Sequence, residues 1–452
     1  MIRVKGNGKL IAQKRYVVED LLSSFFTEQF EYVVDEQIEG YSFESNGKQL
    51  HVPDVFFSDE STYLTKESIP SSLSKINLVL LDGKTIELPM LFGVDLSNRN
   101  SDGVQSFGID IIGSVFFLVS GYEDYILSAT DSHGRLPSEE LLSVKENFFQ
   151  IPILNYYLSA FTVALQNVGF KGVNLREYGE LYFTIDVDHP STLNLSFKKQ
   201  FKTLIKDLIR YRDLGALLRR KYTIITKSVS SDPYNFVPFL GYLKKKYALN
   251  VVVFFMNIDK NGTKHDETYS WNTSFIKYYL KECNRHNFSI GLHPSYNTGD
   301  DQALLRSELK SFRNSVDYYS MNDSRWVRHH YLRLNPGFSW RTMSEQGFEK
   351  DSTVGFADRL GFKAGLCFPY RLFDLKQNKT LDLVEYPFAA MDRTFINLGE
   401  PKEDLIRVVE ETKRFHGNFV YLAHNCELGY SKGKNTGQLV VAEYMMNNAE
   451  QD

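Results

Sequence analysis

The chain has 452 residues, of which 42% are hydrophobic and 14% aromatic, so it is long and apolar enough for two or three domains with large cores. Its formal charge of -4 and pI near 6.2 exclude a bulk attraction to nucleic acid, which normally requires a basic domain or stripe. We therefore expect an ordinary soluble protein without a nucleic-acid partner.

The N-terminus and the cysteines predict a reducing, cytoplasmic location. The first residues lack the uninterrupted apolar core of a secretory signal, and no segment approaches the roughly 18 apolar residues of a membrane span. Cys283, Cys367 and Cys426 are odd in number and far apart, which argues against a disulfide framework and a thiolate zinc site. No Walker, Rossmann, HExxH or GxSxG motif is present, so any catalysis must come from carboxylates, histidines or a metal.

Residues 1–178 predict a smaller, mixed α/β domain. The stretch VLLDGKTIELPMLFG indicates a hairpin around Asp82-Gly83, because Asp-Gly between apolar runs is a strong turn signal. A helix is expected over NYYLSAFTVALQNVGF, followed by the linker KGVNLREYGE. This domain contains no cluster of histidines, cysteines or paired carboxylates, so we expect a structural or substrate-positioning role.

From residue 179 to residue 452 the pattern predicts a second, larger domain. After the run LYFTIDV, short and nearly all-apolar strands are expected at 250–257, 288–293, 362–368 and 418–425, separated by amphipathic helices. Strands buried on both faces and alternating with helices are typical of a parallel sheet or an α/β barrel. In such folds the functional site lies at the carboxyl ends of the strands.

The first of these strands ends in two carboxylates, Asp186 and Asp188, with one residue between them. Residues i and i+2 of a strand face the same way, so both charges are expected in one place. A shared proton, a nearby arginine or a bound cation would offset the repulsion between the two carboxylates. The alternative is an ordinary turn, because Asp is common at strand exits.

The segment SFKKQFKTLIKDLIRYRDLGALLRRKY, residues 196–222, has apolar residues at helical spacing and many Lys and Arg residues. Such a run is most often the solvated face of a helix that packs on a core. The alternative is a dock for an anionic lipid-linked or phosphorylated saccharide.

Further along the chain, GLHPSYNT places His293 at a strand end and Asn297 four residues later. If a helix begins there, i and i+4 lie about 5 to 6 Å apart and can chelate one ion. Asp188, His293 and Asn297 would leave positions open for water and substrate, as a catalytic zinc-type site requires. The alternative is that His293 merely makes structural hydrogen bonds.

Two later segments supply further candidates. In VRHHYLRL, Arg328 is suited to hold a carboxylate in its ionised form, although a purely structural ion pair is an equal alternative. In YLAHN, His424 ends the last apolar strand. A histidine opposite carboxylates is a suitable general acid.

Taken in order, these segments resemble the motifs of the polysaccharide deacetylases, the NodB-like metal-dependent carbohydrate esterases. TIDVDHP is similar to their TFDDG motif with Val187 inserted, and HPSYN is similar to HSxxH with Asn297 in place of the second histidine. RHHY is similar to RPPY, QGFEKDSTVGF to the fourth motif and LAH to the fifth, LxH. EYPFAAMD resembles an E-x-P strand found in branches of the superfamily.

The resemblance implies a distorted (β/α) barrel and a role for each matching residue. Asp186 would be the catalytic base, Arg328 its partner, His424 the general acid, and the Tyr331 amide a donor to the oxyanion. Asp351 would tune the acid, and Asp188, His293 and Asn297 would bind a divalent metal, expected to be zinc. Val187 leaves open whether the two aspartates exchange roles, and Asn297 leaves open a different divalent ion.

The implied activity is removal of an N-acetyl group from an acetamido sugar or a saccharide intermediate of surface polysaccharide metabolism. Two alternatives stay open: an inactive saccharide-binding or assembly protein, and a hydrolase of an O-acetyl ester or a non-sugar amide. FFLVSGYEDY and DSHGRLPSEE resemble a companion domain that precedes such deacetylases in Bacteroidetes-type proteins. We expect a saccharide substrate, no membrane span and peripheral contact with a lipid-linked saccharide, while the sequence leaves the oligomeric state open.

Overall fold

The computed structural model describes residues 1–95, 105–210, 212–247, 249–258, 262–321 and 324–428. Its contacts divide the chain into two units. The first comprises Met1–Tyr178, Asn335–Arg341 and Gly361–Pro387, and the second comprises Gly179–Leu334, Thr342–Leu360 and Phe388–Asp452. The sequence assigned everything after residue 178 to the second domain, whereas two later segments belong to the first unit.

The first unit is a mixed α/β assembly. Its strands are β1 (Ile2–Gly6), β2 (Phe30–Val34), β3 (Tyr41–Ser45), β4 (Lys48–Val52), β5 (Ser74–Val79), β6 (Thr85–Met90), β12 (Tyr370–Asp374) and β13 (Lys379–Glu385). Its helices are α1 (Ile11–Arg15), the π-helix η1 (Tyr16–Leu22), α2 (Ser23–Phe25), α3 (Ile111–Val119), α4 (Tyr122–Ile126), α5 (Leu142–Lys145) and α6 (Ile153–Val168), with the 3-10 turns η2 (Lys66–Ser68) and η3 (Ser138–Glu140). The helix α12 (Ser339–Glu345) crosses a boundary between the units.

Within the first unit the strands form a four-stranded sheet and two antiparallel pairs, β5 with β6 and β12 with β13. The order β2-β1-β3-β4 forms one sheet, in which β1 runs parallel to β2 and antiparallel to β3. β5 and β6 form the hairpin that the sequence predicted, with Val79 opposite Thr85. Its turn needs a residue with positive φ, which Gly83 supplies at 79°. The helix expected over residues 155–170 is also present, as α6.

The strand expected at residues 362–368 is absent from the structure. This stretch is irregular and belongs to the first unit, where the backbone of Gly365 has a φ of 60°. Gly365 O accepts a hydrogen bond from Leu154 N–H at 2.9 Å, and Cys367 N–H donates to Asn155 Oδ1 at 3.1 Å. The residues are apolar because they cover the start of α6, so burial without sheet pairing produced the same sequence pattern as a strand.

The second unit alternates strands and helices. Its strands are β7 (Leu181–Val187), β8 (Asn250–Phe255), β9 (Ser289–Leu292), β10 (Trp326–Val327), β11 (Lys350–Asp351), β14 (Ala390–Met391) and β15 (Phe419–His424). Its helices are α7 (Phe197–Ile205), the π-helix η5 (Lys206–Arg210), α8 (Leu214–Thr226), α9 (Val237–Lys246), α10 (Ser274–Arg285), α11 (Gln302–Tyr318), α13 (Asp392–Asn397), α14 (Lys402–Arg414) and α15 (Asn425–Leu428). Short 3-10 turns are η4 (Thr192–Asn194), η6 (Val229–Ser231), η7 (Tyr296–Gly299) and η8 (His330–Leu332).

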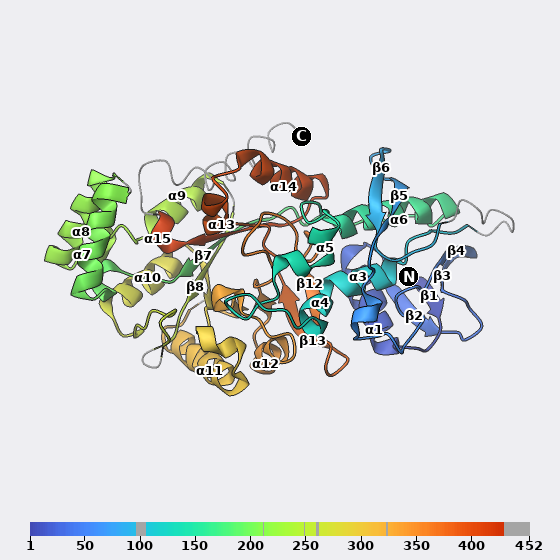
Figure 1. The fold of residues 1–452 in the computed structure, drawn as a ribbon, viewed down its shortest axis with the longest axis horizontal. Helices are drawn as coiled ribbons and strands as arrows, with labels where there is room; N and C mark the ends of the chain where they lie inside the picture. Colours follow the sequence, from blue (N-terminus) through green and yellow to red (C-terminus); the bar gives the residue numbers. More distant parts are fainter. Residues whose placement is uncertain (96–104, 211, 248, 259–261, 322–323, 429–452) are drawn as a thin grey trace. The chain divides into compact units, whose positions relative to one another are not determined.

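The strands of this unit form a parallel sheet in the order β11-β10-β9-β8-β7-β15-β14. Every neighbouring pair in this order runs parallel. All residues of β7 are buried, and Figure 1 shows the helices of the unit distributed around β7 and β8. The α/β class and the strands expected at 250–257, 288–293 and 418–425 are therefore confirmed, and the carboxyl ends of these strands meet at one edge of the sheet.

The strands at the two ends of this order, β11 and β14, approach each other through their flanking residues. Phe388 N–H, before β14, donates to Val354 O, after β11, at 3.1 Å. A Cβ on Gly355 would lie 2.3 Å from the Phe388 ring, so only glycine allows this approach. A sheet whose edges are joined in this way must be curved.

None of the helices in the part of the chain that the structure describes is both long and apolar enough to cross a bilayer. All three cysteines are buried and free.

Candidate active site

Polar side chains follow the carboxyl ends of several parallel strands of the second unit. Asp186 lies near the end of β7 and Asp188 directly after it, and His293 follows β9. Arg328 follows β10, and His424 is the last residue of β15, directly opposite Asp186 in the register. The parallel order of the strands thus brings together residues separated by more than two hundred positions in the chain.

Arg328 fixes the orientation of Asp186. The arginine is fully buried, and its Nη1 donates to Asp186 Oδ1 at 3.1 Å and to Thr184 Oγ1 at 2.7 Å. Its Nε and Nη2 donate to the carbonyl and the hydroxyl of Ser352, both at 2.6 Å. A guanidinium held on all sides cannot turn away, so the charge of Asp186 is balanced within the protein.

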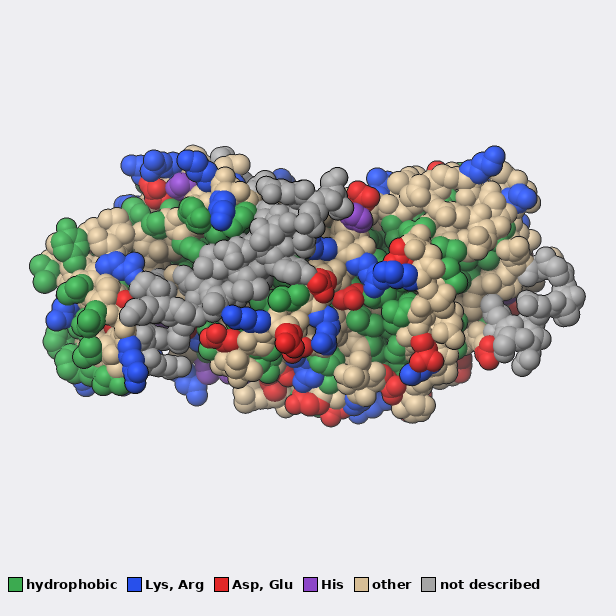
Figure 2. Space-filling view, turned by 90° about the horizontal axis from the view of Figure 1, so that it is seen from above, with side chains coloured by type: hydrophobic (Ala, Val, Ile, Leu, Met, Phe, Trp, Pro, Cys, Tyr) green, Lys and Arg blue, Asp and Glu red, His purple; other side chains and the backbone are tan. Residues whose placement is uncertain are grey.

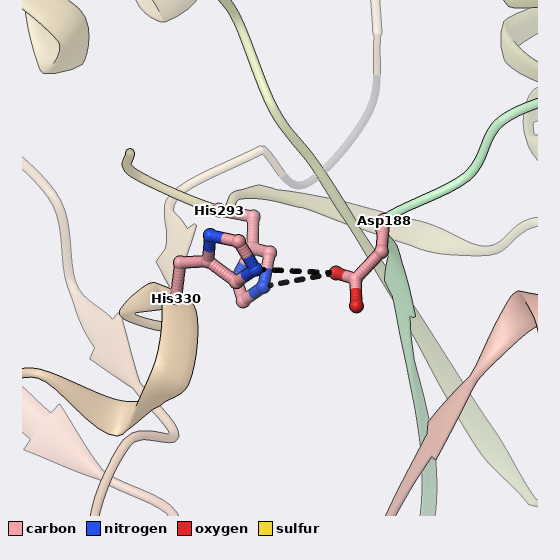
Figure 3. Close-up of side chains that lie close together, drawn as sticks. All are labelled: Asp188, His293 and His330. Carbon is pink, nitrogen blue, oxygen red and sulfur yellow. Dashed lines mark ion pairs between the residues drawn. The ribbon is translucent and has the colours of Figure 1, made fainter. Parts of the chain in front are cut away.

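Asp188 faces imidazole nitrogens instead of a fixed cation. Its Oδ1 lies 3.6 Å from His293 Nε2 and 3.8 Å from His330 Nε2, and its Oδ2 lies 3.9 Å from His424 Nε2. Figure 3 shows the side chains of Asp188, His293 and His330 pointing toward one another. None of these separations is short enough for a hydrogen bond, and no donor among the described residues reaches the buried Oδ1.

The tautomers of these histidines follow from their other ring nitrogen. His293 Nδ1 lies 2.6 Å from the carbonyl oxygen of Arg328, which can only accept, so Nδ1 carries the proton. His330 Nδ1 lies 2.9 Å from Asp266 Oδ1. Burial raises the pKa of Asp266, but hydrogen bonds, first that of His330, outweigh it and lower the pKa to about 2, so this carboxylate accepts too. Both Nε2 atoms therefore present lone pairs toward Asp188.

The three ligand atoms fit a divalent metal ion. One atom from each of Asp188, His293 and His330 lies within 4.8 Å of the others. Around a tetrahedral zinc with bonds of about 2.0 to 2.1 Å, donor atoms lie about 3.3 to 3.4 Å apart, so small side-chain movements would close the site. Two neutral imidazoles whose Nδ1–H groups are held by oxygen acceptors, plus one carboxylate, form a typical ligand set with a position left open.

The electrostatics of the ligands favour a bound cation. Burial alone raises the pKa of Asp188, but the nearby His293, His424 and His330 outweigh it and hold the pKa well below its usual range. Burial lowers the pKa of His293, yet the carboxylates of Asp186 and Asp188 outweigh burial and raise it. A proton on His293 and a metal ion would thus compete for the same nitrogen, which makes metal binding pH-dependent.

Asn297, which the sequence named as the third ligand, is not part of this cluster. Its side chain is exposed on η7. The expected spacing of i and i+4 required a helix that begins at His293, whereas the backbone is still extended at Ser295 and the 3-10 turn begins only at Tyr296. The two side chains therefore do not share a helical face, and the nitrogen that lies near Asp188 and His293 is that of His330.

His424 is held by a carboxylate that the sequence analysis did not name. His424 Nδ1 lies 2.7 Å from Asp392 Oδ1, and the backbone N–H of His424 donates to Asp392 Oδ2, also at 2.7 Å. Burial lowers the pKa of His424, but the charge of Asp392 outweighs it, and the pKa is raised. A histidine that keeps its proton to higher pH is suited to donate one from Nε2.

Asp351, expected from the resemblance to tune the acid, has Thr353 as a hydrogen-bond partner, while the carboxylate at His424 Nδ1 is that of Asp392. Asp351 lies on β11, at the opposite end of the strand order from β15, and its Oδ1 accepts from Thr353 Oγ1 at 2.5 Å. Thr353 Oγ1 in turn accepts the backbone N–H of His329 at 3.1 Å. Asp351 thus supports the loop that carries His330, while Asp392 holds the general-acid candidate.

Tyr331 lies beside the metal ligands in a strained backbone conformation. Its φ is 56° and that of Leu332 is 57°, and left-handed residues other than glycine cost about 1 to 3 kcal/mol each. The Tyr331 ring is 4.6 Å from that of His330. Burial, followed by the charge of Asp188, raises the pKa of the Tyr331 hydroxyl. Such strain is retained only where the surrounding structure imposes it, and it is common at functional sites.

Sequence analysis missed three residues of this site for different reasons. His330 was within a motif that had been identified, but the resemblance gave that position no role. Asp392 ends the stretch EYPFAAMD, which resembles a known strand but implied no role for this residue. Asp266 lies in a polar loop after β8, and no local pattern distinguishes a carboxylate that holds a distant histidine from one at the surface.

Comparisons with known proteins give the following findings. Residues 6–169 match the model of a family of unknown function (DUF7033). No curated protein matches the chain. Among solved structures, the chain is similar to a putative polysaccharide deacetylase from Mycobacterium smegmatis, with 16% identity, a TM-score of 0.39 and coverage of 60% of this chain and 84% of that chain.

Two further solved structures are similar over part of their length. One is a mutant of a CE4 family pseudoenzyme with restored enzymatic activity, with 10% identity, a TM-score of 0.27 and coverage of 60% of this chain and 63% of that chain. The other is the carbohydrate deacetylase Agd3, with 11% identity, a TM-score of 0.35 and coverage of 65% of this chain and 54% of that chain.

Proposed function

We propose that the chain is a metal-dependent hydrolase that removes an N-acetyl group from an acetamido sugar, on a distorted (β/α) barrel of the polysaccharide deacetylase type. The observation that supports the proposal most directly is that the two aspartates have different partners. Asp186 is paired with a buried arginine, whereas Asp188 faces the lone pairs of two imidazoles. The order of the sequence motifs, which resembles that of the polysaccharide deacetylases, supports the same activity.

The proposed ligands are Asp188, His293 and His330. When bound there, a divalent ion, expected to be zinc, would act as a Lewis acid toward the acetyl carbonyl and lower the pKa of the attacking water. Arg328 holds Asp186 in place through its hydrogen bond to Oδ1, and this carboxylate removes a proton from the water. The backbone N–H of Tyr331 donates a hydrogen bond to the acetyl carbonyl oxygen as negative charge develops on it.

Expulsion of the amine requires a proton, which His424 supplies from Nε2. Its Nδ1–H is held by Asp392, which keeps the ring in one orientation and stabilises the positively charged form. The C–N bond breaks as the nitrogen receives this proton. The products are acetate and a free amino sugar, and transfer of a proton from Asp186 to His424, directly or through solvent, restores both groups.

Metal content and acetate release test this proposal together. We expect purified full-length protein to retain a divalent ion and to release acetate from a panel of N-acetylated sugars. Asp186→Asn should lower the rate by about 100-fold to 10,000-fold, the usual worth of a general base, while the ion is retained. Asp188→Ala should lose the ion and the rate, and Asp317→Asn, on the exposed face of α11, is the matched control.

The same panel separates the alternatives. Hydrolysis of O-acetyl esters with no release from acetamido sugars would assign an esterase instead. Sugar binding without any hydrolysis, unaffected by Asp186→Asn, would assign an inactive saccharide-binding protein. Loss of the ion in Asp186→Asn together with its retention in Asp188→Ala would mean that the two aspartates exchange roles.

A further inference from the structure

The helical hairpin of residues 196–227, formed by α7, η5 and α8, exposes an unusual amount of apolar surface. Among the described residues, nine of the sixteen large apolar side chains that are exposed lie in this segment. They are Phe197, Phe201, Ile205, Leu208, Ile209, Leu214, Leu218, Tyr222 and Ile225. The helix α7 has no buried residue at all. The Lys and Arg residues are solvated, as the sequence predicted, but the apolar residues are exposed as well, so they do not pack the helix on a core.

Polar residues occupy the inner side of this hairpin. Arg220 and Asp207 are fully buried and form an ion pair at 2.6 Å. Arg220 also donates to Thr192 Oγ1 at 2.6 Å and lies over the ring of Tyr234, 4.6 Å from its centre. The hairpin is therefore attached to its unit through a charged network, which leaves the apolar side chains without a role in that attachment.

The exposed apolar residues form one stripe on each helix. On the first arm they recur at positions 197, 201, 205 and 208–209, and on the second at 214, 218, 222 and 225. Both series follow the spacing of one face of a helix. Figure 1 shows α7 and α8 side by side, and Figure 2 shows hydrophobic side chains mixed with Lys and Arg over this end of the second unit. Exposed apolar stripes on two neighbouring helices mark a contact surface.

The charge of the hairpin indicates the kind of partner. Residues 196–227 contain ten Lys and Arg residues and two Asp residues, in a chain whose formal charge is -4. Both aspartates, Asp207 and Asp213, are buried. The exposed basic residues are Lys198, Lys199, Lys202, Lys206, Arg212, Arg219, Lys221 and Lys227. The exposed surface of the hairpin therefore has only positive charges beside its apolar stripes.

We propose that this hairpin docks the protein on the surface of an anionic lipid bilayer. Apolar stripes flanked by Lys and Arg are the pattern of helices that lie in the interface of a membrane, where the apolar side chains enter the acyl boundary and the basic ones contact lipid phosphates. A second copy of the chain fits less well, because two such surfaces would bring like charges together. The surface lies close to the candidate site in the same unit.

The contact with the site runs through α7. Lys199 Nζ lies 2.6 Å from Glu267 Oε1, and His189 Nδ1 lies 3.5 Å from the same oxygen. His189 directly follows Asp188 in the chain. A bilayer bound by the hairpin would therefore lie beside the carboxyl ends of the strands, where a substrate enters.

Sedimentation with lipid vesicles tests the proposal on the full chain. We expect binding to vesicles of equal parts phosphatidylglycerol and phosphatidylcholine and little binding to phosphatidylcholine alone. Lys198→Ser with Lys202→Ser should weaken binding by about 25-fold, since each basic residue near an anionic surface contributes about fivefold. Phe197→Ser with Phe201→Ser should abolish it. Tyr318→Ser, an equally exposed aromatic outside the hairpin, should bind like the unchanged protein.

Three results would overturn the proposal. One is failure to sediment with the anionic vesicles. The second is equal binding to both kinds of vesicle that the lysine substitutions do not change. The third is a dimer in solution, detected by light scattering, that Phe201→Ser dissociates and that does not bind vesicles, because the surface would then be an interface between copies. Melting temperatures of the variants, expected to be unchanged at these exposed positions, exclude misfolding as the cause.

Discussion

Both units bury carboxylates, but the groups that surround those carboxylates differ. In the first unit Asp110 accepts the backbone N–H groups of Val55, Phe56 and Gly113 at 2.8 to 2.9 Å, and Glu123 accepts that of Leu142 at 2.8 Å. Burial raises the pKa of each of the two carboxyl groups to about 7. Whether protonated or ionised, these carboxyl groups have a structural task, because they satisfy backbone donors that would otherwise be buried alone.

In the second unit, no backbone donor among the described residues reaches the buried Oδ1 of Asp188. Asp188 faces imidazole nitrogens, and the nearby His293, His424 and His330 hold its pKa well below the usual range despite burial. An ionised carboxylate beside neutral imidazoles is stable only when a positive charge joins them. The comparison teaches that burial alone does not identify a functional carboxylate, whereas the kind of atom that faces it does.

The largest expected effect tests this difference with one substitution in each unit. Asp188→Asn should reduce metal affinity by more than about 100-fold, the upper end of what loss of a ligand's own hydrogen-bond partner costs, and should leave the fold intact. Asp110→Asn should leave metal affinity unchanged but lower the free energy of unfolding by about 1 to 3 kcal/mol, because an amide cannot satisfy all three N–H donors. Metal titration and denaturant unfolding of both variants provide the measurements. The comparison fails if the two substitutions have the same effect.

The second prediction concerns the pH dependence of stability through Glu123. Its folded pKa of about 7 lies above its usual value of 4.5, so its contribution to stability is full below pH 4.5 and is lost as the pH rises through 7. Between pH 5 and 8 this loss amounts to about 2 to 3 kcal/mol. Glu123→Gln should therefore flatten the fall of unfolding free energy over this range, while Glu139→Gln, at an exposed position nearby in the sequence, should not. An unchanged slope in the Glu123 variant would show that its carboxyl group ionises at the same pH in both states.

A smaller effect is expected from the carboxylate that holds a metal ligand. Asp266→Asn removes the charge that fixes Nδ1–H of His330 and should lower metal affinity by about 10-fold to 100-fold. Asp300→Asn is the matched control in the same unit, because Asp300 pairs with Arg333 at an exposed position. Competition with a chelator measures both affinities. Equal affinities would mean that Asp266 belongs with the structural carboxylates of the first unit.

Much of the second unit could be predicted from the sequence, because a strand covered on both faces must be apolar throughout and polar where it ends. That rule found β7, β8, β9 and β15 and placed Asp186, Asp188, His293 and His424 at their carboxyl ends. The same rule failed at 362–368, where an equally apolar stretch covers a helix of the first unit. A run of apolar residues indicates that a segment is buried, but it does not indicate whether the segment pairs with strands or packs on a helix.

The rest of the site depends on contacts between distant segments. Asp392 and Asp266 act on histidines that lie 32 and 64 positions further along the chain. Local spacing cannot reveal such pairs. The hairpin at 196–227 shows the same limit, because helical periodicity identified an apolar face but could not tell whether that face is inside or outside.

The smallest expected effect is at Asn297, where sequence and structure disagree about a ligand. Its side chain is exposed on η7, so Asn297→Ala should change metal affinity by no more than about twofold, as most surface substitutions do. His330→Ala should release the ion, because its Nε2 is one of the three atoms that converge. The metal affinities of both variants are measured by the same chelator competition at one pH, so that protonation of His293 is equal in each. If Asn297→Ala weakened binding as strongly as His330→Ala, the amide would have to turn inward when the ion binds, and an exposed polar group could then belong to the site as fully as a buried one.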